Sequence, residues 1–340
     1  MTTTQQWQMH GYGEQQLELV TTTLPEPGPG EVLVKVAAAA LNYRELLMIE
    51  HGLGLPLAFP QVPGSDLAGT VLATGPGVSR VQVGQRVIST FWGDWDDGLV
   101  PPRDTWGTSL GGPLTGTLSQ HVVIKAEHLV AAPATLDDVA ASTLTCAGLT
   151  AWFALVDHGG IQTGDTVVVQ GTGGVALWAA QIALAHGATV IATSGSPEKL
   201  ARLAALGVQH GIDRHAHPEW SQQVHALTTG RGADHVLELV GGSNIQQSLA
   251  AVRQGGRISV IGVLEDTELA FSAVQLLLRR PTIQGIGVGP RGALERLAAF
   301  VDQHRLQPVI AAEFGYRDLP RALAALRAGP FGKVVVRFDQ

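Results

Sequence analysis

Alternating apolar and polar residues along the first third of the chain predict a series of short strands. Leu17–Val20 alternates in this way, and Glu31–Ala37 resumes as a strand after a loop of prolines and glycines. Turns such as Gly75-Pro76-Gly77 separate these runs and no helical period intervenes, so we expect a barrel or a sandwich here. The other strands predicted in this part are Ala68–Ala73, Arg86–Thr90 and Ser119–Ile124.

From about residue 130 to residue 288 the pattern changes to apolar strands that alternate with helices. The strand Thr166–Gln170 leads through a glycine-rich turn into an apolar helix that ends near His186. Six strands with helices between them predict a doubly wound parallel Rossmann sheet that binds its ligand at the carboxyl ends of the strands. The remaining predicted strands are Thr189–Thr193, His210–Asp213, His235–Val240, Arg257–Val263 and Thr282–Val288, and the helices are Ser196–Leu206, Trp220–Thr229 and Asn244–Val252.

Composition narrows the class of protein. A chain of 340 residues exceeds what one core usually supports, so we expect two domains. The net charge of −7, without a run of Lys or Arg, excludes the basic surface that binds nucleic acid or an anionic membrane. The single cysteine, the uncharged polar start and the lack of an uninterrupted apolar stretch of about 20 residues lead us to expect a cytoplasmic protein without a membrane span.

The glycine-rich turn predicts a dinucleotide site. Gly171, Gly173 and Ala176 match the pattern G-x-G-x-x-G/A, which gives a tight turn, a close approach to a pyrophosphate and close packing of helix on strand. The N–H groups and the dipole at the start of the helix then favour the phosphate charge. We therefore expect Thr172, Gly174 and Val175 to contact the cofactor together with Gly171 and Gly173.

The end of the second Rossmann strand indicates which dinucleotide binds. NAD-binding chains normally place Asp or Glu about 20 residues after the glycines, and this chain has Ser194 there instead. A carboxylate would repel a 2′-phosphate, whereas Lys199 and Arg214 can pair with one. The cofactor prediction is therefore NADP(H), although Lys199 is also typical of a solvated helix face.

Three segments have a structural and a functional interpretation. Asn42 can simply cap a short helix, and Asp66 can be a turn residue. The loop 91–116 carries Trp92, Trp95 and Trp106 and is either a lid that lines a substrate site or a loop packed on itself.

With its β-rich start, central Rossmann segment and short β return, the chain resembles the medium-chain dehydrogenase/reductase superfamily, and its zinc-independent quinone oxidoreductase-like branch in particular. The resemblance implies an α/β fold with a GroES-like catalytic domain at 1–128, an NADP-binding Rossmann domain at 129–288, a return to the catalytic domain at 289–340, and a homodimer. The motifs that carry it are Leu41–Leu47, Pro63–Gly69, Leu144–Ala151, Gly171–Ala176, Gly230–Asp234 and Gly332–Val336.

The same resemblance argues against a metal. Zinc-dependent relatives have Cys where Asn42 stands, a His-Glu pair where Ser65-Asp66 stands, and a second Cys at Cys146. Only Cys146 keeps a side chain that zinc favours, and one cysteine cannot form a four-Cys lobe. We expect no bound zinc.

The resemblance also implies roles for single residues. Asn42 and Thr150 would hold the nicotinamide carboxamide or the substrate oxygen, and Tyr43 and Arg44 would supply a proton and an oxyanion-stabilising cation. Asp66 would orient Arg44. Gly241 and Gly242 would flank the nicotinamide ribose and Lys333 would approach the phosphates, while the Gly-x-Tyr of many relatives is absent at Gly52-Leu53-Gly54.

The expected activity is NADPH-dependent hydride transfer to a small-molecule electrophile, either a quinone or an α,β-unsaturated carbonyl. A zinc-free NADP-dependent alcohol dehydrogenase or carbonyl reductase is the alternative, and a non-catalytic NADPH-binding protein is a third hypothesis.

Overall fold

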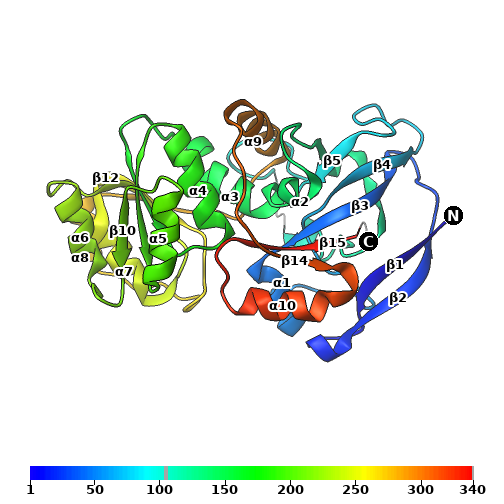
Figure 1. The fold of residues 1–340 in the computed structure, drawn as a ribbon, viewed down its shortest axis with the longest axis horizontal. Helices are drawn as coiled ribbons and strands as arrows, with labels where there is room; N and C mark the ends of the chain where they lie inside the picture. The colour runs from blue at the N-terminus through cyan, green and yellow to red at the C-terminus, as the bar shows by residue number, and fades with distance from the viewer. Residues whose placement is uncertain (103–105, 339–340) are drawn as a thin grey trace. The chain divides into compact units, whose positions relative to one another are not determined.

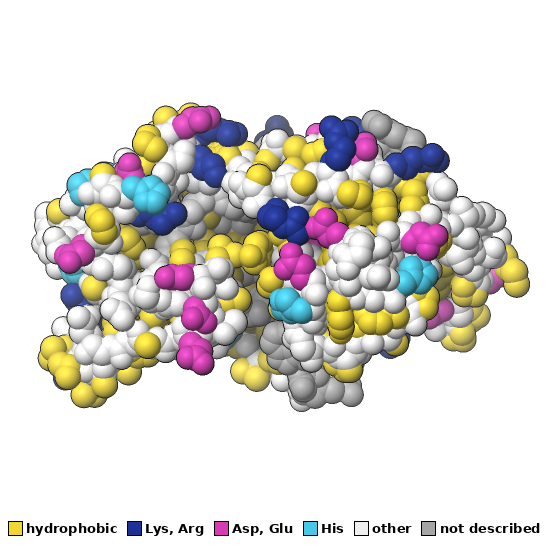
Figure 2. Space-filling model, turned by 90° about the horizontal axis from the view of Figure 1, so that it is seen from below, with side chains coloured by type: hydrophobic (Ala, Val, Ile, Leu, Met, Phe, Trp, Pro, Cys, Tyr) yellow, Lys and Arg dark blue, Asp and Glu magenta, His cyan; other side chains and the backbone are white. Residues whose placement is uncertain are grey.

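The computed structural model describes residues 1–102 and 106–338, and its chain forms two compact units (Figure 1). The first unit comprises Met1–Leu149 and Gly289–Gln340, and the second comprises Thr150–Val288. On the face that Figure 2 presents, acidic and basic side chains are interspersed. The fold class is as predicted: a GroES-like β-rich domain and a Rossmann-like parallel sheet.

The first unit is built around the long strand β3 (Glu31–Leu41). Most of its side chains are buried, and the strand pairs antiparallel with β4, β6 and β15. Near-continuous apolar sequence suits a strand that is covered on both faces. The other strands of this unit are β1 (Thr2–Met9), β2 (Leu17–Leu24), β4 (Ala68–Thr74), β5 (Arg86–Ser89), β6 (His121–Lys125), β7 (Leu129–Ala131), β14 (Ile310–Gly315) and β15 (Lys333–Arg337).

Helices cover this β-structure. The helix α1 (Tyr43–His51) follows β3 directly, and α10 (Leu319–Arg327) lies between β14 and β15 along the chain. The buried residues Val34, Leu67, Leu118 and Val336 belong to one apolar core. The remaining helices are α2 (Asp138–Ala141), α9 (Arg291–His304) and α3 (Leu149–Trp152), the last of which crosses the boundary between the units.

The boundary predicted between residues 128 and 129 is too early. The strand β7 pairs antiparallel with β5, and the Thr145 hydroxyl donates to the Ser89 carbonyl oxygen at 2.7 Å. Residues 129–149 therefore complete the first unit, and the second begins at Thr150. The return to the first unit falls at Gly289, where the sequence analysis places it.

The second unit contains the predicted six-stranded parallel sheet, in the order β10-β9-β8-β11-β12-β13. This is the strand order of a doubly wound dinucleotide-binding fold, with the switch point between β8 and β11. Its strands are β8 (Thr166–Gln170), β9 (Thr189–Ser194), β10 (His210–Asp213), β11 (Ala233–Glu238), β12 (Val252–Val260) and β13 (Thr282–Gly285). Its helices are α4 (Gly174–Ala185), α5 (Pro197–Ala205), α6 (Trp220–Leu227), α7 (Ile245–Ala251) and α8 (Ala273–Arg279).

Two further expectations concern individual segments. The helical stretch Asp138–Asp157 is long and apolar enough to cross a membrane, which differs from the predicted lack of such a stretch, but 83% of its most apolar window is buried, as in a core helix. In the loop 91–116, Trp92 and Trp95 are both buried, which favours a loop packed on itself. Residues 103–105 and the side chain of Trp106 lie outside the described part of the structure.

Candidate functional site

Asn42 caps the start of the helix α1 and holds the Glu45 carboxylate through hydrogen bonds. Its backbone is extended, its N–H donates to the Glu45 carboxylate at 2.6 Å, and its carbonyl oxygen accepts from the Glu45 N–H at 3.0 Å. This is the arrangement in which a residue in the first helical turn reaches back to the capping residue. The predicted cap is therefore present, and it draws Glu45 inside the protein, where only 1% of the residue is exposed.

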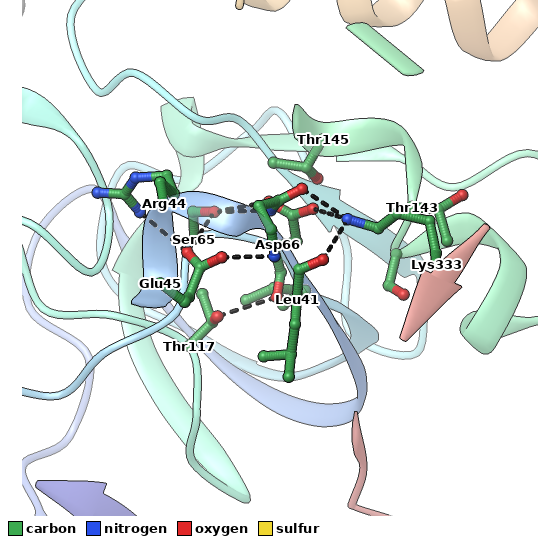
Figure 3. Close-up of polar contacts among 12 residues, drawn as sticks. Leu41, Arg44, Glu45, Ser65, Asp66, Thr117, Thr143, Thr145 and Lys333 are labelled. Carbon is green, nitrogen blue, oxygen red and sulfur yellow. Dashed lines mark hydrogen bonds and ion pairs between the residues drawn. The ribbon is translucent and has the colours of Figure 1, made fainter. Parts of the chain in front are cut away.

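A second buried carboxylate lies next to the first (Figure 3). The Ser65 hydroxyl lies 2.7 Å from Oδ1 of Asp66 and 3.3 Å from Oε1 of Glu45. Because a hydroxyl has one proton, Ser65 can donate to only one of these carboxylates at a time. The Thr117 hydroxyl donates to the Asp66 carbonyl oxygen at 2.9 Å, which holds the backbone of this loop.

Lys333 supplies the positive charge on the other side of Asp66 (Figure 3). Its ammonium donates to the Leu41 carbonyl oxygen at 2.6 Å and to Oδ1 of Asn42 at 2.5 Å, and it lies 3.9 Å from Oδ2 of Asp66. Lys333 is buried. Its ammonium is thus enclosed within the first unit, which differs from the phosphate contact that the resemblance implies.

Burial controls the ionisation of this cluster. It raises the pKa of Asp66 to about 6, and the Lys333 ammonium partly offsets this effect. Burial also raises the pKa of the Cys146 thiol, and the negative charge of Asp66 raises it further. Oδ2 of Asp66 accepts no hydrogen bond from any described residue. The cluster therefore favours the neutral form of the Cys146 thiol, and the buried Oδ2 of Asp66 is an acceptor without a hydrogen-bond donor among the described residues.

The structure separates Arg44 from Asp66, so the predicted orientation of Arg44 by Asp66 is wrong. The Arg44 guanidinium donates to Glu45 and to the Leu110 carbonyl oxygen, both at 3.1 Å, and lies over the ring of Phe91. Arg44 pairs with Glu45 instead of Asp66 because Glu45 is the neighbouring residue on α1 and its carboxylate already points into the protein. Tyr43 is 45% exposed at the start of the same helix, so its phenol is accessible from solvent.

These residues do not suit a zinc ion. Zinc needs about three deprotonated nitrogen, sulfur or carboxylate ligands. Here Oδ1 of Asn42 accepts from the Lys333 ammonium, and an amide is not one of these ligand types. Across residues 1–102 and 106–338, no group of three or more His, Cys, Asp or Glu side chains could hold a metal ion.

The second unit presents the predicted turn for a dinucleotide. Gly171 has a φ of 76°, a conformation that favours glycine, and donates its N–H to the Thr193 carbonyl oxygen at 2.8 Å. A Cβ atom added at Gly171 or Gly173 would meet nothing within 4 Å. Thr172 is buried between these two glycines.

The start of α4 is suited to bind the phosphates. Gly173 precedes the helix, so the N–H groups of Gly174 and Val175 belong to the first turn, which has no intrahelical acceptors. This end of the helix fits an anionic dinucleotide.

Basic side chains gather where β9 ends at Ser194. A Cβ at Gly195 would lie 2.5 Å from Nε2 of His215 and 3.2 Å from Nε of Arg214, so both side chains pack against this glycine. Lys199 lies in the first turn of α5, where its N–H donates to the Ser196 hydroxyl at 3.3 Å. Ser194 and Gly195 lie where a ribose-binding acid would stand, and neither residue carries a carboxylate. Sequence reasoning missed His215, which directly follows Arg214.

Gly241 and Gly242 follow β11 and have φ angles of 80° and 53°. A Cβ at Gly241 would lie 2.7 Å from the Asp266 carbonyl oxygen, so only glycine fits there without strain. The N–H groups of Val240 and Gly241 donate to Oε1 of Glu238 at 2.9 and 3.0 Å. A buried carboxylate therefore anchors the loop that is predicted to flank the ribose.

Glu238 is fully buried, and each of its described partners donates a hydrogen bond to its carboxylate. The Asn244 amide donates to both of its oxygens at 2.9 Å, the Gln170 amide donates at 3.2 Å, and the Ser248 hydroxyl donates as well. Gln170 ends β8, so this network joins the two strands at the switch point. Sequence reasoning missed Glu238, although a carboxylate within the apolar run His235–Val240 is a detectable signal.

Thr150, predicted to lie beside the nicotinamide, is buried at the start of the second unit. Glu45 and Ser65 are polar residues of the Asp66 cluster that sequence reasoning did not select as site residues. Glu45 has a local signal, because Asn followed three residues later by Glu is typical of a helix start.

Comparison with known proteins defines the family. The zinc-binding dehydrogenase family matches residues 174–303, and the alcohol dehydrogenase GroES-like domain matches residues 28–134. A zinc-type alcohol dehydrogenase-like protein of Schizosaccharomyces pombe is 37% identical over 319 residues, which are 92% of each chain. The chain belongs to the medium-chain dehydrogenase/reductase superfamily and, within it, to an alcohol dehydrogenase-like oxidoreductase family.

Two solved structures are similar over almost the whole chain. One, from Sinorhizobium meliloti 1021, carries the provisional description of an alcohol dehydrogenase; it is 51% identical, covers 99% of both chains and has a TM-score of 0.95. The other, an NAD-dependent alcohol dehydrogenase, is 32% identical, covers 98% of this chain and 99% of its own, and has a TM-score of 0.89. The superfamily binds a nicotinamide dinucleotide.

Proposed function

We propose that this protein is a zinc-independent, NADPH-dependent reductase of quinones or α,β-unsaturated carbonyls. The observation that carries the proposal is the Lys333 ammonium bonded to Asn42, at a position where zinc-dependent relatives place a metal ligand. A fixed organic cation at this position supports chemistry that does not need a Lewis acid. This proposal departs from the zinc-type name of the Schizosaccharomyces pombe relative.

The bound nicotinamide would supply the hydride, and reduction of a quinone or an enone needs one further proton. Asn42 is partly exposed as a residue, and its amide can donate a hydrogen bond to the substrate oxygen or to the carboxamide. Tyr43 is the exposed phenol of the same segment and is our candidate for the proton donor. Arg44 is held by Glu45 and Leu110, so its role is to position α1 rather than to move toward substrate.

Arg214, His215 and Lys199 support the preference for NADPH. A guanidinium that packs against Gly195 can pair with a 2′-phosphate through charge-assisted hydrogen bonds. We expect Arg214→Gln to lower kcat/KM for NADPH roughly ten- to hundredfold and to leave the value for NADH nearly unchanged, since one such bond contributes about 1.5–3 kcal/mol. The exposed Arg202 of α5 is a matched control, and Arg202→Gln should alter neither value. Equal or higher kcat/KM of the unmodified protein with NADH would contradict the proposed coenzyme.

A screen of NADPH oxidation with quinones, enones, aldehydes and ketones tests the activity itself. Turnover of quinones or enones by protein without stoichiometric zinc is the expected result. Turnover of alcohols with NADP⁺ but not of enones would favour the alternative, a zinc-free alcohol dehydrogenase or carbonyl reductase. Tight NADPH binding without oxidation of any electrophile would favour a non-catalytic binding protein. Stoichiometric zinc in the purified protein would overturn the metal-free assignment.

We further propose that the protein is a cytoplasmic homodimer that pairs through the edge of the second unit. Within the described residues, β13 pairs with β12 and with no other strand. The neighbouring helix α8 exposes Val274, Leu277 and Leu278. An unpaired edge strand next to exposed apolar side chains is a surface that a second copy of the chain can cover.

A further inference from the structure

We propose that Lys333 is a positioning residue that fixes the orientation of the Asn42 amide, so that its NH₂ group is the donor available to a ligand. The inference rests on the proposed function, in which Asn42 contacts the coenzyme or the substrate. It assigns to Lys333 a task in the first unit that is independent of any phosphate contact.

The chemistry of the two groups determines the orientation. A lysine ammonium has three donors and no acceptor, so only the oxygen of the Asn42 amide can face it. Oδ1 accepts from Nζ of Lys333 at 2.5 Å, and Nδ2 lies 3.4 Å from the Ser65 hydroxyl oxygen. One of the two N–H groups is thus directed at Ser65, and the Asn42 side chain also hydrogen-bonds to Asp66, so a ligand would compete with that carboxylate for the second N–H. The capping box also directs the Glu45 N–H toward the Asn42 side chain, so without the ammonium the amide loses one of two donors that favour this orientation.

The backbone holds Lys333 in place. Its strand β15 pairs with β3, with Val334 opposite Leu41, so Lys333 is fixed beside the residues that precede α1. The N–H of Lys333 donates to the Val309 carbonyl oxygen at 2.9 Å. Gly332 has a φ of 106°, and a Cβ there would lie 2.3 Å from the same oxygen, so the turn into the strand is restricted to glycine. The ammonium therefore has little freedom to leave Asn42.

A second task of Lys333 has to be separated from the first. Its charge also lies 3.9 Å from Oδ2 of the buried Asp66, so a variant without the ammonium loses both the hold on Asn42 and the compensation of a carboxylate. Loss of activity in Lys333→Met alone would not distinguish them. The double variant Lys333→Met/Asp66→Asn does, because it removes both opposite charges together.

The test compares stability and kinetics of these variants. We expect Lys333→Met to lower the melting temperature and to reduce kcat roughly tenfold with little change in the coenzyme KM. In the double variant we expect the melting temperature to recover while kcat stays low. Recovery of kcat together with stability would overturn the proposal and leave Lys333 as a compensating charge only. Lys125→Met, which removes an exposed lysine from β6, is the matched control and should leave both quantities unchanged.

A measurement without turnover separates this proposal from the proposed function. The side-chain NH₂ signals of Asn42 in an ¹⁵N NMR spectrum can be assigned by their loss in Asn42→Asp. We expect these signals to shift and broaden in the double variant and to be unchanged in Lys125→Met. If the protein reduces no electrophile but the signals respond in this way, the function is wrong and the positioning is right. Unchanged signals in the double variant would overturn the positioning.

Discussion

Asp66 is a carboxyl group without solvent contact, and its environment makes a prediction about stability. Burial raises its pKa from 3.8 to about 6, so between these values the folded protein binds more protons than the unfolded chain. The contribution of Asp66 to the free energy of unfolding therefore falls as pH rises from about 4 to about 6. A shift of this size corresponds to as much as about 3 kcal/mol.

Asp66→Asn tests this sign because it removes the titrating group at nearly constant volume. We expect the stability of the variant relative to the unmodified protein to increase as pH rises from 4 to 7. Chemical denaturation at several pH values measures the difference directly, and other carboxylates cancel in it. A difference that stays constant over this range would mean that Asp66 is not perturbed as we infer.

Sequence reasoning located some residues of the cluster but not their partners. Asn42 and Asp66 could be predicted from local motifs, because each lies in a short segment whose residue pattern can be recognised in the sequence alone. The contact of Lys333 with Asn42 depends on the pairing of β15 with β3, which joins residues almost 300 positions apart. Nothing near Lys333 in the sequence reveals that pairing.

At the scale of elements, the strand ends of the second unit are joined by the network around Glu238. The ends of β8 and β11 meet there, and the backbone N–H groups of the glycine loop after β11 donate hydrogen bonds to the same carboxylate. Since each described partner of Glu238 is a donor, an amide in its place would direct an NH₂ group at other donors. The Glu238 carboxylate is therefore not interchangeable with its amide isostere.

We expect Glu238→Gln to lower the free energy of unfolding by about 2–4 kcal/mol, because it leaves buried donors unsatisfied. We also expect weaker NADPH binding, since the loop with Gly241 and Gly242 loses its anchor. Urea denaturation and a fluorescence titration with NADPH measure the two effects. Glu268→Gln changes an exposed carboxylate of the same unit and is the control. Normal stability and affinity in Glu238→Gln would contradict this role.

Most helices and strands could be predicted where the hydrophobic periodicity of the sequence was strong. The six Rossmann strands were found because apolar and β-branched runs alternate with helical segments in this half of the chain, and glycines interrupt them. The predicted strand Arg257–Val263 was displaced, since β12 begins at Val252 and pairs with β11 across an irregular register. The strand β7 and the helix α8 were missed: one has three residues, and the other exposes the apolar side chains that a core helix would bury.

At the scale of the whole molecule, the sequence predicted two domains and the return near residue 289, but it placed the first boundary too early. Alternation of strand and helix marks where the Rossmann pattern starts, not where the preceding chain stops packing on its own sheet. Residues 129–149 contain helical turns, yet they complete the first unit through β7 and Thr145. Tertiary contacts decide such boundaries.

The assembly that we propose follows from the outer edge of the second unit. Leu277 and Leu278 are 71% and 68% exposed on α8, and β13 has one free edge in the described sheet. We expect Leu277→Asp to convert a dimer into a monomer of 35.6 kDa in light scattering after size exclusion, because burying an unpaired carboxylate in an apolar interface is costly.

Leu206→Asp is the control: Leu206 is also exposed but follows α5, a helix near the opposite edge of the sheet, so that variant should stay dimeric. A monomeric unmodified protein, or a dimer that Leu277→Asp leaves intact, would exclude this surface as the interface.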